Sequence, residues 1–161
     1  MIGNQNENAD KFVVFYLDEQ RYALHLSSVE RVVRVVEITH LPKAPEIILG
    51  VINLRSRIIP VIDIRRRFSL NEREIDLYDH LVVARTSKRS IAFIADGSEG
   101  VFEIPEKEIE AADDIYPELD YITGIAKKEE GMIHILDLEI MLSPSEIESL
   151  EDAMDEERRK D

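Results

Sequence analysis

Residues 50–68 read GVINLRSRIIPVIDIRRRF, and residues 124–142 read GIAKKEEGMIHILDLEIML. The two stretches align without a gap, with Gly50 on Gly124 and Asp63 on Asp137. Each holds two runs of β-branched and apolar residues on either side of a polar tip, a pattern typical of a strand hairpin. The sequence therefore predicts a duplicated unit built from hairpins.

The repeat also includes the residues that precede each of these stretches. Their alternating apolar residues predict further short hairpins, so we expect a mainly β protein. The length of 161 residues fits one ordinary domain, or two small ones that share a core. The upstream alignments are residues 12–14 with 81–83, residues 22–24 with 91–93, and Glu30 with Glu99.

Composition excludes several classes of protein. The chain has no cysteine, so it has neither a disulfide framework nor a thiolate metal site. No apolar run is long enough for a signal peptide or a membrane span, and residues 1–10 are polar, which predicts a flexible arm. The formal charge of −14 disfavours nucleic acid as a bulk electrostatic partner.

Two segments carry capping signals for helices. Ser27 and Glu30 have the spacing of a capping box, so we expect one or two helical turns there and then a strand through Ile38. Ser143, Pro144 and Glu146 form a second such signal ahead of an apolar stripe. Residues 143–161 should therefore form an amphipathic helix followed by a charged tail.

Five arginines lie between residues 55 and 67, against one acid, Asp63. They form either a solvated basic edge or a patch that docks an acidic partner surface. The arginines are Arg55, Arg57, Arg65, Arg66 and Arg67.

No residues with the spacing of a catalytic or metal site stand out in the sequence. The four histidines lack metal-ligand spacing, and no glycine-rich phosphate loop occurs. Asp63 and Asp137 are equivalent in the repeat, which favours a structural role such as accepting hydrogen bonds from backbone amides at a strand end. We therefore expect a protein that is not an enzyme and that needs no cofactor and no metal.

The stretch Gly50-Val51-Ile52-Asn53-Leu54-Arg55, followed by Ile58-Ile59-Pro60-Val61-Ile62-Asp63-Ile64-Arg65, resembles the signature of the CheW family of chemotaxis coupling proteins. Residues 12–17, 22–24, 94–97 and 121–125 also resemble the family's pattern. The resemblance covers roughly residues 11–150.

The resemblance implies two small five-stranded β-barrels, related by duplication and exchanging segments. The CheW-like domain would span residues 11–142. One barrel would combine residues 11–45 with 117–142, and the other would be the continuous stretch 46–114.

The resemblance also implies a cytoplasmic adaptor without catalytic activity. Such a protein bridges the cytoplasmic tip of a chemoreceptor and the regulatory domain of the histidine kinase CheA, without inserting into the membrane. Whether copies also assemble with one another stays open. The implied receptor-binding residues are Glu30, Gly50, Arg55 and Val101, and the implied kinase-binding residues are Val82, Ile115 and Tyr116.

One residue departs from the family's pattern, because Ser56 stands where a glycine usually follows the arginine. Glycine there allows a positive backbone φ angle, which serine adopts at some cost. The alternative function is a small barrel that binds single-stranded nucleic acid along the arginine-rich edge. Such proteins stack bases on aromatic side chains, and only Phe68 lies near these arginines.

Overall fold

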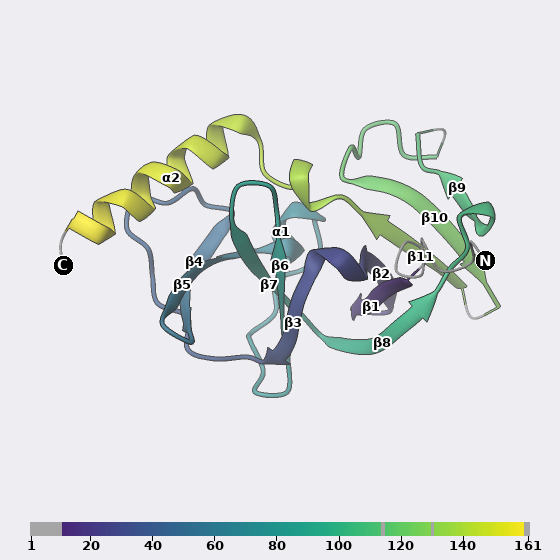
Figure 1. Cartoon of the computed structure of the whole chain (residues 1–161), viewed down its shortest axis with the longest axis horizontal. Helices are drawn as coiled ribbons and strands as arrows, with labels where there is room; N and C mark the ends of the chain where they lie inside the picture. The colour runs from purple at the N-terminus through teal and green to yellow at the C-terminus, as the bar shows by residue number, and fades with distance from the viewer. Residues whose placement is uncertain (1–10, 114, 130, 160–161) are drawn as a thin grey trace, which may run out of the picture.

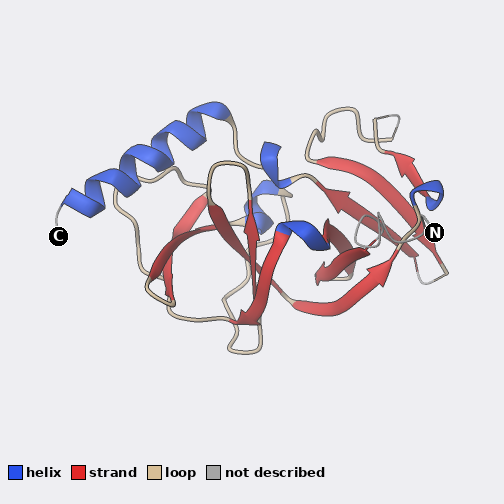
Figure 2. Ribbon diagram, viewed as in Figure 1, coloured by secondary structure: helices blue, strands red, loops and turns tan. Residues whose placement is uncertain are grey.

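The computed structural model describes residues 11–113, 115–129 and 131–159, which form a mainly β protein with one long helix (Figures 1 and 2). The strands are β1 Lys11–Leu17, β2 Gln20–His25, β3 Val29–Arg34, β4 Ile48–Leu54, β5 Arg57–Ile62, β6 His80–Arg85, β7 Ser90–Ala95, β8 Gly97–Glu103, β9 Ile109–Ala111, β10 Ile122–Lys128 and β11 Gly131–Leu136. The helices are η1 Leu26–Ser28, α1 Ile64–Arg67, η2 Glu106–Glu108, η3 Leu138–Ile140 and α2 Pro144–Arg159.

The strands form two mixed sheets whose orders are related by the repeat. The six-stranded sheet has the order β8-β1-β2-β11-β10-β9, and the five-stranded sheet has the order β3-β6-β7-β5-β4. The first repeat supplies β1 to β5, and the second supplies β6 to β8, β10 and β11. Each sheet therefore joins the first hairpin of one repeat to the last three repeat strands of the other.

The strand registers agree with the alignment of the repeats. In the parallel pairs, Ile135 lies opposite Ala23 in one sheet, and Val61 lies opposite Ala92 in the other. The two pairs are equivalent in the repeat, because Val61 aligns with Ile135 and Ala92 aligns with Ala23. The duplication thus extends to individual pairs of residues.

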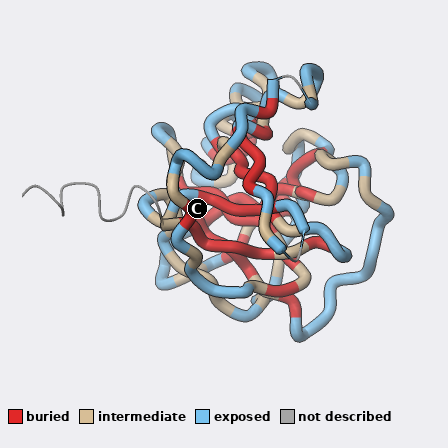
Figure 3. The backbone as a smooth tube through the Cα atoms, turned by 90° about the vertical axis from the view of Figure 1, so that its right-hand side faces the viewer, coloured by how far each residue is buried: buried red, intermediate tan, exposed pale blue. Residues whose placement is uncertain are grey.

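The core has one shared part and two equivalent smaller parts, and Figure 3 shows the buried backbone running through the strands. The shared cluster joins residues such as Phe15 and Leu24 of one sheet to Val82 and Phe93 of the other. A second cluster lies within the six-stranded sheet and a third within the five-stranded sheet. Because both sheets bury side chains in one common core, the described chain folds as one unit.

The prediction of two five-stranded barrels is confirmed only at a coarser level, as two mixed sheets. The segment that carries β8 ends in β9 at the opposite edge of the same sheet. Likewise, the chain after β3 reaches β4 through an isolated bridge between Thr39 and Val51. Among the described strands no ladder joins β8 to β9 or β3 to β4, which are the edges of the two sheets.

The predicted division of the chain is wrong at two places. Strand β3 was placed with residues 11–45 of the first barrel, but it pairs with β6 in the other sheet. Strands β8 and β9 were placed in the stretch 46–114, but they pair with β1 and β10. The exchange is therefore symmetric. The third strand of the first repeat, β3, pairs with the first hairpin of the second repeat, and the third strand of the second repeat, β8, pairs with the first hairpin of the first.

The capping signal at Ser27 does not begin the predicted helical turns. A single 3-10 turn lies earlier, at Leu26–Ser28, without a side-chain cap, and residues 29–34 form a strand. The β-branched valines of this segment lose rotamer freedom in a helix and pack well in a sheet. Strand pairing with β6 therefore prevails over the cap.

The second capping signal is confirmed. The Ser143 Oγ accepts a hydrogen bond from the Glu146 amide at 3.1 Å, and the Glu146 carboxylate accepts one from the Ser143 amide at 2.8 Å. Helix α2 then buries Leu150, Ala153 and Met154 against the shared core. The arm at residues 1–10 and the last two residues of the tail lie outside the described residues.

Candidate functional site

Glu30, a predicted receptor-binding residue, sits at an irregularity in strand β3. The register with β6 shifts between Val29 and Arg31, which leaves Glu30 without a partner in the ladder. Its carboxylate accepts hydrogen bonds from Arg57 at 3.0 Å and from the hydroxyl of Ser90. These bonds, from Arg57 first and Ser90 second, hold the pKa of Glu30 below its ordinary value. Glu30 therefore links three strands of the five-stranded sheet as a carboxylate.

Arg55, the predicted receptor-binding arginine, lies at the tip of the turn between β4 and β5. Arg55 and Ser56 have φ angles of 52° and 68°, which lie in the left-handed region. Ser56 thus adopts the conformation for which glycine is favoured, at a cost of roughly 1 kcal/mol. The Arg55 side chain is exposed, and in the described part of the chain it forms no ion pair.

The turns at this end of the five-stranded sheet gather further cations around a shallow hollow of about 230 Å³. Arg57 is bonded to Glu30, and Arg89 is bonded to Glu151 of α2 at 2.8 Å. Arg85 and Lys88 are exposed and have no ion pair with any described residue. We call Arg55, Arg57, Arg85, Lys88 and Arg89 the basic end.

The equivalent end of the six-stranded sheet has the opposite charge. Its hollow of about 340 Å³ is lined by the acids Asp18, Glu19 and Glu99 and by one cation, Arg21. Asp18 pairs with Arg65 and Glu99 with Arg21, so Glu19 is the acid of this hollow without an ion pair in the described chain. Glu19 occupies the repeat position of Lys88, so the backbone is duplicated while the charge is reversed. Both ends keep an exposed apolar residue at one equivalent position, Ile58 at 52% and Met132 at 47%. The duplicated scaffold therefore carries two chemically different surfaces.

The arginine-rich segment does not form the continuous patch considered from the sequence. Four of its five arginines bind carboxylates of this chain, which lie far from them in sequence. The pairs are Arg57 with Glu30, Arg65 with Asp18 and Asp96, Arg66 with Glu46, and Arg67 with Glu146. Arginines that neutralise internal carboxylates give little support to the alternative of a nucleic-acid edge.

Gly50 and Val101, the other predicted receptor-binding residues, differ in exposure. Gly50 is buried, and a Cβ added there would lie 2.3 Å from the backbone oxygen of Thr39. Its role in this structure is to let the chain after β3 approach β4. Val101 is 54% exposed on β8, the edge strand of the six-stranded sheet. Of these two, only Val101 offers a side chain to a partner.

The three predicted kinase-binding residues lie in three different environments. Val82 is fully buried in the shared core, so its prediction as a contact residue is wrong. Tyr116 packs against that core and its hydroxyl lies 3.2 Å from the Nε2 of His134. Ile115 remains 47% exposed beside it. The connection between β9 and β10 thus packs its tyrosine against the core and leaves its isoleucine exposed.

The described residues contain no candidate metal site. No group of three or more histidine, aspartate or glutamate side chains could hold a metal ion in residues 11–113, 115–129 and 131–159. No helix in the described chain is long and apolar enough to span a membrane.

Sequence reasoning missed Arg85 and Lys88, which, like Arg55, belong to the basic end and have no ion pair in the described chain. They flank the turn between β6 and β7, and the sequence shows there only a polar turn between two strands. A signal was available in the repeat, because the aligned turn at residues 18–20 carries acids instead.

Comparisons with known proteins agree with this architecture. A family model described as the CheW-like domain matches residues 11–146. The chain is 29% identical over 145 residues to the chemotaxis protein CheW of Bacillus subtilis, covering 89% of this chain and 93% of that protein. It is 30% identical over 125 residues to the chemotaxis protein CheW of Thermotoga maritima, covering 78% and 82% of the two chains.

A solved structure also matches, that of the scaffolding protein TtCheW from Thermoanaerobacter tengcongensis. The TM-score is 0.75 at 34% identity, and the match covers 85% of this chain and 94% of that one. The match to the family model, the duplicated sheets and the conserved arrangement of this solved relative lead to one conclusion: the chain belongs to the CheW-like family of chemotaxis scaffolding proteins.

Proposed function

We propose that this chain is a non-enzymatic adaptor that joins the cytoplasmic tip of a chemoreceptor to the regulatory domain of the kinase CheA. The observation that carries the proposal is the pair of unlike surfaces on one duplicated, rigid scaffold. An adaptor must hold two partners in register, so that movement of one biases the conformational equilibrium of the other.

The receptor side of the proposal rests on the basic end and the edge strands. Arg55 is exposed and forms no ion pair in the described chain, so its guanidinium can form a bidentate pair with a carboxylate of a partner. Glu30 and Val101 lie on β3 and β8, the edge strands that the exchange gives to the two sheets. Gly50 contributes indirectly, because it lets the chain after β3 approach β4.

The kinase side rests on Ile115 with Tyr116 as its support. An exposed isoleucine in an acid-rich stretch of sequence resembles an apolar anchor with a polar rim. Tyr116 fixes the segment to the core through its ring and its hydroxyl. The kinase would then contact the connection between β9 and β10, and the receptor would contact the basic end and the edge strands β3 and β8.

Two substitutions test the proposal together. Arg55→Ala should weaken receptor binding by about 2 kcal/mol, roughly thirtyfold in Kd, and leave the affinity for the kinase unchanged. Ile115→Asp should weaken kinase binding and leave receptor binding unchanged. Both side chains are exposed, so neither variant should lower the melting temperature appreciably.

The matched controls are Arg66→Ala and Ile140→Asp, which make the same chemical changes at exposed positions elsewhere. Titration calorimetry with a receptor cytoplasmic fragment and with the CheA regulatory domain gives the affinity of each variant for each partner. The assignment of the two sides is wrong if each variant weakens both partners equally, or if the controls match the test variants.

A further inference from the structure

A loop between α1 and β6 presents apolar side chains that neither the receptor side nor the kinase side uses. Residues 71–78 are all exposed. Leu77 and Tyr78 are 82% and 76% exposed, the largest values among the large apolar and tyrosine side chains of the described chain, and Ile75 is 49% exposed. Contiguous exposed apolar residues in a soluble protein mark a contact surface more often than scattered single ones do.

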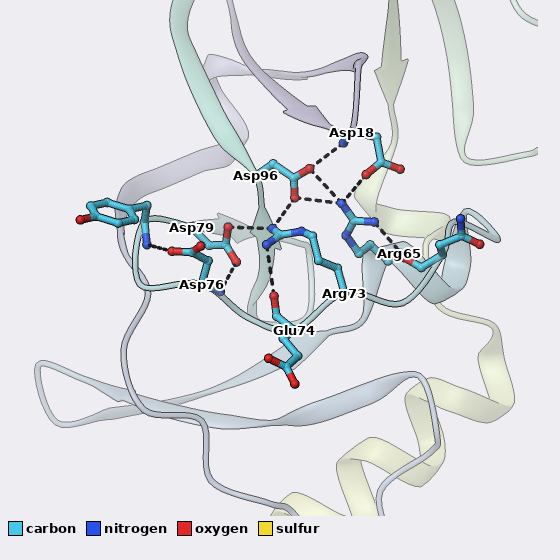
Figure 4. Close-up of polar contacts among 9 residues, drawn as sticks. Asp18, Arg65, Arg73, Glu74, Asp76, Asp79 and Asp96 are labelled. Carbon is cyan, nitrogen blue, oxygen red and sulfur yellow. Dashed lines mark hydrogen bonds and ion pairs between the residues drawn. The ribbon is translucent and has the colours of Figure 1, made fainter.

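This loop is held in one shape by buried and half-buried ionic contacts (Figure 4). The Arg73 guanidinium donates to Asp79 at 2.7 Å and to Asp96 at 2.6 Å, and Asp79 is only 3% exposed. The Asp79 carboxylate also accepts from the Asp76 amide at 2.7 Å, and Asp76 accepts from the Tyr78 amide at 2.9 Å. Leu77 and Tyr78 therefore project from an ordered turn. Binding of a partner to them costs little additional conformational entropy of the loop.

A hollow of about 350 Å³ lies beside the loop and continues the apolar surface inward. Leu49, Ile62 and Ile94 contribute apolar side chains to it, and Ile75 lies on its loop side. Arg65 and Arg73 also line it, but both are neutralised by Asp18, Asp79 and Asp96. The acidic side chains of Glu72 and Glu74 at the hollow have no ion pair within the described chain.

From these contacts we infer that residues 72–78, with the hollow beside them, form a third docking surface for a basic amphipathic helix of a partner protein. Leucine-sized side chains of the helix would enter the hollow and pack on Leu77 and Tyr78. Lysines or arginines beside them would face Glu72, Glu74 and Asp76. The same acids oppose an anionic membrane, because its headgroups repel them. This inference does not rest on the proposed receptor and kinase sides.

A short amphipathic helical peptide of leucine and lysine is the probe for this surface. In a two-dimensional amide NMR titration at physiological salt, the largest shifts should lie at residues 72–78 and around Leu49 and Ile94. A peptide with the same leucines and glutamate in place of lysine should not bind. The double variant Leu77→Ser, Tyr78→Ser should weaken binding at least about tenfold, on the scale of anchor residues.

The matched control is Ile115→Ser, which removes an exposed apolar side chain from the connection between β9 and β10 and should bind the peptide like the unchanged protein. If the double variant bound the peptide as tightly as the unchanged protein does, the inference would be overturned, because the basic peptide would then bind the acidic protein nonspecifically. Shifts spread over residues 106–110 and α2 would do the same. Shifts at residues 72–78 on raising the protein concentration without peptide would make a second copy the occupant, and would also overturn it.

Discussion

At the scale of residues, the sequence predicts positions whose role the repeat itself reveals. The carboxylates of Asp63 and Asp137 were expected to bind backbone amides, and they accept from the Arg66 and Glu139 amides at 3.1 and 2.9 Å. The partners of the arginines could not be predicted, since Arg57 meets Glu30 only through the irregularity in β3. The assignment of Val82 followed the family resemblance, and it is wrong because β6 is buried on both faces, with Leu81 to Ala84 all inside the molecule.

A substitution at Gly50 tests its packing role against the same change in the other repeat. Gly50→Ala places a Cβ 2.3 Å from the Thr39 backbone oxygen, whereas Gly124→Ala places one 2.5 Å from the Ile109 side chain. Backbone cannot move aside as a side chain can, so we expect Gly50→Ala to cost about 1–3 kcal/mol and Gly124→Ala clearly less. Urea unfolding measures both; equal losses, or a larger one at Gly124, would rule out the contact with Thr39 as the cause.

At the scale of elements, the sequence predicts helix α2 well and strand β3 poorly. The capping box and apolar stripe of α2 are local, so its start at Pro144 and its buried face could be read directly. Strand β3 carries an equally local cap signal, but its ladder with β6 involves residues that are distant in the sequence. The contacts of α2 are also non-local, because Arg67, Arg89 and Lys43 bind three of its acids.

The cap of α2 should make its docking depend on pH. Burial raises the pKa of Glu146, but hydrogen bonds from the Ser143 amide and the Arg67 guanidinium outweigh it, so the pKa lies below the ordinary 4.5. A lowered carboxylate pKa stabilises the folded state fully above the ordinary value, and the contribution is lost as the pH falls through the folded-state value.

Glu146→Gln should therefore destabilise the protein by about 1–2 kcal/mol at pH 7, and by progressively less below pH 4.5. Glu148→Gln on the same helix is exposed and is the matched control, with no change expected. Thermal melts followed by circular dichroism across this range measure the difference. A loss that stays constant with pH would show that the carboxylate is not the stabilising group.

At the scale of the whole molecule, the resemblance to the CheW family predicts that the two halves exchange segments, and the repeat does not say which strands cross over. The alignment of the two repeats is the same whether a strand pairs within its own half of the chain or with the other half. The choice is made by connections, because β7 runs into β8 with only Asp96 between them and carries β8 into the six-stranded sheet. The opposite charges of the two ends, in contrast, could have been read by comparing aligned turns.

The symmetric exchange predicts that neither half of the chain folds alone. A fragment ending at Asp79 would contain β1 to β5, whose first hairpin belongs to one sheet and whose other strands belong to the other. Its apolar strands would lack partners, so it should be unfolded or aggregated, as should the fragment from residue 80 onward. Mixing the two should restore cooperative melting. Dispersed amide resonances and cooperative melting of either fragment by itself would contradict the exchange.

The central claim is that one rigid scaffold binds the receptor and the kinase at the same time. Sedimentation velocity of this protein with a receptor cytoplasmic fragment and the CheA regulatory domain tests it most directly. We predict one species that contains all three components, and an affinity for the kinase domain that is not lowered when the receptor fragment is saturating. Displacement of the kinase domain by the receptor fragment, with only binary complexes at every ratio, would contradict the account.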